Sequence, residues 1–277
     1  MNRKKGFRWI SIVFTILIVI VRISGMFRSD DSPSPNPVTM DDSGYESSYC
    51  SEKQNEYREV RQTLRSWRDY YSEDYCITYT TARRAFSDTR DYRNRMQPPD
   101  AYSRSEHWHD IYSMLYEQDY DYVTPLTDSL FKLKQKNQLD RDEFADMIVT
   151  FVQDIPYSYV LDMERCQDQD DPMHCIQDER FGLLSPIEFM HSLYGDCDTR
   201  TLLLYTIFKH FNYEPVIVNS WVYMHSMLLL DVGGNGGAYL KKNGKRYYFW
   251  ETTATGWMSG QMPPDMGNLE SWEVILD

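Results

Sequence analysis

The sequence predicts an α+β fold in which a helix that begins at Cys197 packs on an antiparallel sheet. Leu202, Ile207 and Phe211 recur at helical spacing after this cysteine, and Pro215 follows the end of the run. Segments rich in β-forming residues come next, at residues 215–222, 223–232 and 245–253. A helix followed by consecutive strands is typical of α+β proteins rather than of alternating α/β folds.

Other local signals complete this picture. Asn243 and Gly244 separate two β-like runs and form the dipeptide typical of a type I′ hairpin. Asp140 and Glu143 have the spacing of a capping box and open a helix that we expect to end at Gln153. Further elements are expected as helices over residues 52–71, 106–116 and 125–136, and as a short strand over residues 75–80.

The chain of 277 residues divides into four predicted parts. Residues 1–28 form a signal anchor or signal peptide, and residues 29–49, rich in Ser, Asp, Pro and Gly, form a flexible linker. Residues 50–139 form a mostly helical N-terminal extension, and residues 140–277 form the domain that contains Cys197.

The N-terminus predicts membrane targeting. Four basic residues precede an apolar run from Trp9 to Val21, which is the positive-inside pattern. Counted from Phe7 to Phe27, the segment reaches the ~20 residues that span a bilayer. We favour an uncleaved anchor with the rest of the chain outside the cytoplasm, and a cleaved signal peptide with a secreted or periplasmic product stays the alternative.

Charge and cysteine content narrow the class of protein. The formal net charge of −13 argues against nucleic acid as a partner, because such proteins carry a basic patch. Outside the cytoplasm disulfides are permitted, and five cysteines leave at least one unpaired. Cys166 and Cys175 are a natural pair, Cys50 and Cys76 make a second candidate pair, and Cys197 is then left over.

The candidate catalytic residues are Cys197, His225 and Glu251. The N-terminus of a helix offers unpaired N–H groups and a partial positive charge, which both favour a thiolate at Cys197. Asp196 and Asp198 are expected to serve this helix N-terminus rather than the chemistry. A cysteine, a histidine and a carboxylate on three successive elements are the parts of a nucleophile system.

Strand alternation supports a contact between the histidine and the acid. His225 and Leu229 share one face of their strand, and Phe249 and Glu251 share one face of the next strand. His225 and Glu251 therefore meet if these two faces coincide.

This arrangement resembles the transglutaminase-like superfamily, whose papain-like core has the same chain order. The resemblance covers about residues 140–260 and is carried by residues 195–203, 225–228 and 250–253. It implies a membrane-anchored, bacterial-type member with a transglutaminase-like catalytic domain over residues 140–277. The chain has Glu251 where the family usually has aspartate.

The resemblance implies that Cys197 attacks an amide carbonyl and that His225 takes the thiol proton or pairs with the thiolate. Glu251 would fix the imidazole tautomer, and a thioacyl intermediate would pass to water or to an amine. The N–H of Cys197 is one expected oxyanion donor, and Gln153 or Tyr157 is the expected second.

The preferred function is hydrolysis of a protein or peptide substrate, a cell-envelope peptide being one candidate. A catalytically idle module that binds proteins or envelope polymers is the alternative, and a secreted binding domain stabilised by disulfides is a weaker third. No cofactor and no metal are expected, because His107, His109 and Asp110 have no further ligands at suitable spacing. Asp168 and Asp170 lack the glycine and the distal glutamate of a calcium loop.

Overall fold

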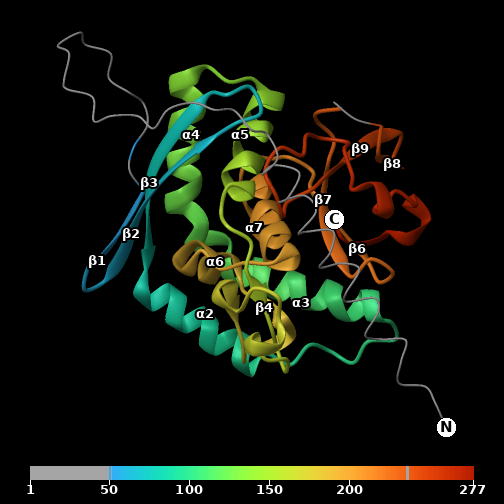
Figure 1. Ribbon diagram of the computed structural model, residues 1–277, viewed down its shortest axis with the longest axis horizontal. Coiled ribbons are helices and arrows are strands. Elements are labelled where there is room, and N and C mark those ends of the chain that lie inside the picture. The colour runs from blue at the N-terminus through green and yellow to red at the C-terminus, as the bar shows by residue number, and fades with distance from the viewer. Residues whose placement is uncertain (1–49, 51, 235–236) are drawn as a thin grey trace, which may run out of the picture. The chain divides into compact units, whose positions relative to one another are not determined.

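A computed structural model describes residues 50, 52–234 and 237–277 (Figure 1). The expected signal anchor at residues 1–28 and the expected linker at residues 29–49 lie outside the described residues. None of the helices within the described ranges has the length and hydrophobicity that a membrane span requires.

The first part of the described chain is an antiparallel sheet. Its strands, in the order β1-β2-β3, are β1 (Lys53–Glu56), β2 (Val60–Arg68) and β3 (Asp74–Ala82). The strand predicted at residues 75–80 is confirmed, but the helix predicted over residues 52–71 is wrong. Thr63, Arg65 and Trp67 alternate inward along β2, and the arginine among them hides the apolar alternation. Arg65 is buried because it pairs with Glu52 and Asp154.

The expected mostly helical extension over residues 50–139 is therefore a mixed segment, with helices only after the sheet. The longer helices of the described chain are α2 (Arg83–Arg95), α3 (Arg104–Asp119), α4 (Thr124–Asn137), α5 (Arg141–Gln153), α6 (Pro186–Ser192) and α7 (Cys197–His210). The predictions for α3, α4, α5 and α7 are confirmed. Asp140 caps α5 in the predicted box with Glu143.

A second antiparallel sheet follows α7 and confirms the α+β class. Its strands, in the order β10-β6-β7-β9-β8, are β6 (Val216–Ser220), β7 (His225–Leu230), β8 (Tyr239–Lys242), β9 (Lys245–Trp250) and β10 (Glu273–Leu276). Asn243 and Gly244 both have positive φ, of 50° and 78°, and join β8 to β9 as the predicted hairpin.

Helix α7 lies between α5 and α6 on one side and β7 on the other (Figure 1). Its apolar side chains, among them Leu202, pack in one cluster with Leu228 of β7 and Trp250 of β9. Trp67 of β2 and Leu115 of α3 belong to the same cluster. Residues on both sides of the predicted domain boundary at 139/140 therefore share one hydrophobic core.

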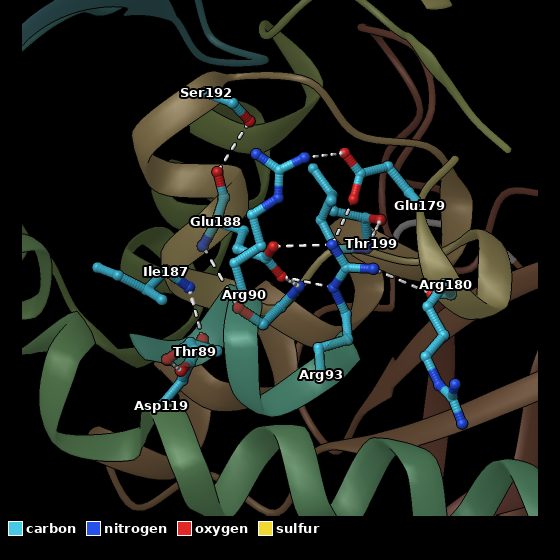
Figure 2. Close-up of polar contacts among 12 residues, drawn as sticks. Thr89, Arg90, Arg93, Asp119, Glu179, Arg180, Ile187, Glu188, Ser192 and Thr199 are labelled. Atoms are coloured by element: carbon cyan, nitrogen blue, oxygen red, sulfur yellow. Dashed lines mark hydrogen bonds and ion pairs between the residues drawn. The ribbon is translucent and has the colours of Figure 1, made fainter. Parts of the chain in front are cut away.

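A buried ionic cluster joins α2 to α6 and to the segment before α6 (Figure 2). The side chain of Arg93 is fully buried and donates two hydrogen bonds of 2.8 Å to Glu188. It also pairs with Glu179 and donates to the carbonyl of Arg180 at 3.1 Å. Arg90 reaches Glu179 from the rim at 3.2 Å. Arg93 thereby neutralises Glu188, and shares Glu179 with Arg90.

Both predicted disulfides are present. Cys50 bonds to Cys76 and Cys166 bonds to Cys175, and Cys197 is a free, buried cysteine. The second bond closes the acidic loop that follows β4 (Tyr159–Val160), and its Cys175 lies in β5 (Cys175–Ile176), which pairs with β4.

Replacement of Arg93 by methionine is expected to lower the free energy of unfolding by about 3–5 kcal/mol, because it leaves Glu188 as an unpaired buried charge and Glu179 with only the rim contact from Arg90. Urea unfolding followed by circular dichroism measures the difference. Arg84 of the same helix is the matched control, since its side chain is 89% exposed and pairs only with Asp88. Arg84→Met should change the stability by less than about 1 kcal/mol. Equal losses in the two variants would contradict this assignment.

Candidate active site

Cys197 is the first residue of α7, as predicted. The preceding Asp196 caps the helix through a 3.1 Å hydrogen bond from the backbone N–H of Thr199 to its carboxylate. The cysteine is 8% exposed, so the thiol is almost withdrawn from solvent.

His225 and Glu251 contact each other directly. His225 opens β7, Glu251 directly follows β9, and the distance from His225 Nε2 to Glu251 Oε2 is 2.9 Å. Leu229 pairs with Phe249 in the ladder between these strands, which brings the two predicted faces onto one side of the sheet. The predicted contact between the histidine and the acid is therefore present.

The Glu251 carboxylate is held from both sides. While Oε2 faces the histidine, Oε1 accepts hydrogen bonds of 2.8 Å from the N–H groups of Thr252 and Thr253 and one of 2.6 Å from the Thr253 hydroxyl. Burial alone would raise the pKa of Glu251, but His225 and Thr253 outweigh it and lower the pKa to about 2. Glu251 is therefore a fixed negative charge. Its extra methylene, relative to aspartate, is accommodated at the strand end.

The imidazole of His225 is enclosed. Burial lowers its pKa, but the charge and hydrogen bond of Glu251 outweigh burial and raise the pKa above its ordinary value. Trp272 packs edge-on against the ring at a centroid distance of 6.1 Å. Because Nε2 faces the carboxylate, Nδ1 is the ring nitrogen suited to exchange a proton with a nucleophile.

The Cys197 sulfur lies at the start of β7. The backbone N–H of Ser226, the residue after His225, lowers the pKa of this thiol, and the charge of Glu251 raises it, so both groups lie near the sulfur. The ladder between β7 and β9 ends at the pair Leu228–Trp250, so His225 and Glu251 both lie just beyond this end of the ladder. All three candidate residues therefore lie around one strand end.

The expected thiolate is not what this environment favours. Burial raises the pKa of the Cys197 thiol well above its ordinary value, and the charges of Asp198 and Asp196 raise it further. The prediction considered the helix N-terminus and omitted burial, which acts in the opposite direction. The environment of Cys197 therefore favours the neutral thiol.

The two flanking aspartates differ in role. Asp196 caps the helix as predicted, and burial followed by the charge of Asp198 raises its pKa to about 8. Asp198 instead accepts hydrogen bonds from Tyr112, at 2.6 Å, and from Ser226. Asn219 on the neighbouring strand joins this network. The network fixes the first turn of α7 to the start of β7.

Gln153 is not available as an oxyanion donor. Its side-chain nitrogen donates to the carbonyls of Glu251, at 2.7 Å, and Trp257, at 2.9 Å, and its oxygen accepts from Tyr70. These contacts hold the segment that follows Glu251. Gln153 also lines part of a cavity of about 410 Å³. Of the two predicted donors only Tyr157, whose ionisation is linked electrostatically to Cys197, remains next to the thiol.

Arg200 is a residue of the site that sequence reasoning missed. It lies one turn after Cys197 and its guanidinium bonds only to main-chain carbonyls among the described residues. A charged residue on the buried side of an apolar helix was the available signal, but carbonyl partners on distant segments have no sequence signature.

The groups considered and rejected as metal ligands have other partners. His109 contacts the carbonyl of Ile275 at 2.8 Å, and Asp168 pairs with Arg165. Within residues 50, 52–234 and 237–277 no group of three or more His, Cys, Asp or Glu side chains could hold a metal ion.

The His225–Glu251 pair is expected to stabilise the fold most strongly within a limited pH range. The lowered pKa of Glu251 contributes stability above its ordinary value of 4.5, which is lost as the pH falls toward 2. The raised pKa of His225 contributes stability below its ordinary value of 6.5, which is lost as the pH rises through the folded pKa. Glu251→Gln should therefore cost most stability between these two ordinary values.

Urea unfolding of the wild-type and Glu251→Gln proteins at about pH 3, 5.5 and 9 measures this window. Glu214→Gln, which removes an exposed acid that accepts from Lys245, is the control and should show no such maximum. A cost of Glu251→Gln that does not vary with pH would contradict the ion pair.

Comparison with protein-family models, with curated proteins and with solved structures gives no match for this chain. The function considered below is therefore supported by the side chains and geometry of the chain itself.

Proposed function

We propose that this chain is an extracytoplasmic cysteine enzyme that acts on amide bonds through Cys197, His225 and Glu251. The proposed core is papain-like and similar to that of the transglutaminase-like superfamily, with the nucleophile at a helix N-terminus and the base and acid on the sheet. The observation that carries the proposal is the buried 2.9 Å contact between His225 and Glu251 beside the helix that begins with Cys197.

In the proposed reaction, the S–H bond of Cys197 breaks as the sulfur attacks the amide carbonyl, and His225 Nδ1 receives the proton. The carbonyl electrons move to oxygen, where the N–H of Cys197 is the first donor. The C–N bond then breaks, the imidazolium returns the proton to the leaving amine, and a thioester remains. Water, or a second amine, attacks the thioester and releases the acyl group. Hydrolysis of a protein or peptide is the preferred outcome.

Glu251 serves this cycle by orienting the imidazole and by stabilising the imidazolium. Its own low pKa keeps it ionised throughout the neutral range, so it is not the group that moves the proton. The aspartate that is usual in the family and the glutamate of this chain are chemically equivalent in that role.

One observation favours the alternative of an idle binding module. The Cys197 thiol is buried and its pKa is raised, so the resting protein holds few thiolates. Alkylation separates the two functions, because an enzyme carries one thiol that reacts fast with iodoacetamide, whereas an idle module carries a thiol that reacts slowly or not at all.

Substitution of the three residues tests the enzyme directly. In an assay with a fluorogenic peptide-amide library, Cys197→Ala should abolish turnover, and His225→Ala should lower it by about 10³-fold or more. Glu251→Gln should retain measurable activity, because the amide still contacts the ring but carries no charge. Thr206→Ala, on the same helix, is the control, because the Thr206 hydroxyl donates to the carbonyl of Leu202 within that helix. Activity that survives Cys197→Ala would contradict the proposal.

The proposed location is the outer face of a membrane, with residues 7–27 as the anchor. The two disulfides are compatible with an oxidising compartment. Secretion after signal cleavage is the alternative location.

Protease added to spheroplasts that express the full chain should digest the body of the protein while leaving cytoplasmic markers intact. The protein should remain in the membrane fraction after a high-salt wash, because an apolar anchor is insensitive to salt. Recovery of a soluble form that starts near residue 30 would show cleavage instead.

A further inference from the structure

The side chain of Arg200 is fully buried, on a helix whose other inward residues are mostly apolar. Residues three positions apart lie on the same side of a helix, so Arg200 stands one turn behind Cys197. The mechanism above does not use it, although a buried guanidinium is costly to desolvate and needs a physical reason to be there.

The guanidinium joins three separate segments through four hydrogen bonds to carbonyl oxygens. One, of 2.9 Å, reaches Gly195, two residues before the nucleophile. Another, of 3.1 Å, reaches Thr252, directly after the acid. The last two reach Val152, at 3.0 Å, and Ile155, at 2.6 Å, at the end of α5.

These bonds connect the main-chain segments that lie around Cys197. The Ile155 carbonyl lies two residues before Tyr157, whose ring stacks near the guanidinium at 5.5 Å from its centroid. The next N–H along the chain, that of Ser158, donates to the same Gly195 carbonyl at 3.2 Å. The turn before the nucleophile is therefore fixed to the acid-bearing segment through one side chain.

The charge of Arg200 is as unusual as its position. Within the described residues it forms no ion pair, yet Asp196, Cys197 and Glu251 all interact with it electrostatically. Burial lowers the pKa of Arg200 to about 10, so the side chain still carries its charge at neutral pH. It is a cation beside a thiol whose pKa is raised by burial and, to a lesser extent, by Asp198 and Asp196.

We propose that Arg200 is a positioning residue of the nucleophile: it fixes the turn before Cys197 against the segment after Glu251, and its buried charge favours the Cys197 thiolate. This proposal rests on the proposed function, which makes Cys197 the nucleophile. When the thiol proton moves to His225, negative charge appears on sulfur, and Arg200 is the second cation that stabilises it. An arginine that only joined segments would affect stability and leave the ionisation of Cys197 unchanged.

The pH dependence of Cys197 alkylation by iodoacetamide tests the proposal in the full-length, detergent-solubilised protein. The other four cysteines are in disulfides, so the alkylation rate measures Cys197 alone. Arg200→Gln should raise the midpoint of the rate–pH profile by about one unit, which is about tenfold slower alkylation at a fixed pH below the midpoint. Arg200→Lys keeps the charge but lacks the planar guanidinium with its several donors. Its alkylation rate should stay within about threefold of that of the wild type.

Arg65 provides the matched control, because it is 4% exposed and pairs with Glu52 and Asp154 rather than with the site. Arg65→Gln should lower the midpoint of urea unfolding and leave the alkylation profile in place. A folded Arg200→Gln protein with the wild-type profile would overturn the proposal, as would an equal shift in Arg65→Gln. If Arg200→Gln does not fold, the lysine variant decides, and a folded Arg200→Lys protein slowed tenfold overturns the role of the charge.

The readout also separates this proposal from the proposed function. Alkylation requires no amide substrate, so a protein without amide turnover can still show the shift in Arg200→Gln. Conversely, a protein that cleaves amides and shows no shift retains its function and loses the role assigned to Arg200.

Discussion

The hydrogen bonds of Arg200 to four main-chain carbonyls are the constraint on which the candidate site depends. Cys197, Glu251 and Tyr157 come from three segments that share no secondary structure, and the guanidinium contacts the main chain next to each of them. Carbonyl partners leave the positive charge uncompensated, whereas a carboxylate partner would have cancelled it. The same side chain therefore supplies both geometry and a local field.

The balance of buried charge around the sulfur follows from this arrangement. Glu251 and Asp198 contribute negative charge around the sulfur, and Arg200 and protonated His225 contribute positive charge. Asp196 differs from these groups, since burial, followed by the charge of Asp198, raises its pKa to about 8. Its carboxylate caps α7 by accepting a hydrogen bond from the N–H of Thr199.

Sequence periodicity was sufficient for the elements that carry the site. The stripe of Leu202 and Ile207 predicts α7. Alternation along the two neighbouring strands places His225 and Glu251 on the same side of the sheet. Strand β2 of the first sheet was not predictable in this way, because Arg65 occupies an inward position that the pattern assigns to an apolar residue. What decides the inward position of Arg65 is its pairing with Asp154, 89 residues away in the chain.

The ionisation of Cys197 shows where sequence reasoning ends for the chemistry. A helix N-terminus is visible in the sequence and favours a thiolate, but burial depends on residues from β7 and from the loop at Tyr157, and it has the larger effect. Near neutral pH, Glu251 stays ionised and Arg200 stays protonated, so neither exchanges a proton. His225, whose pKa Glu251 raises above its ordinary value, is the remaining group of the proposed triad that can accept one. In the proposed mechanism, proton transfer from Cys197 to His225 therefore places an imidazolium next to the new thiolate, and the charge of Arg200 adds to the stabilisation of that thiolate.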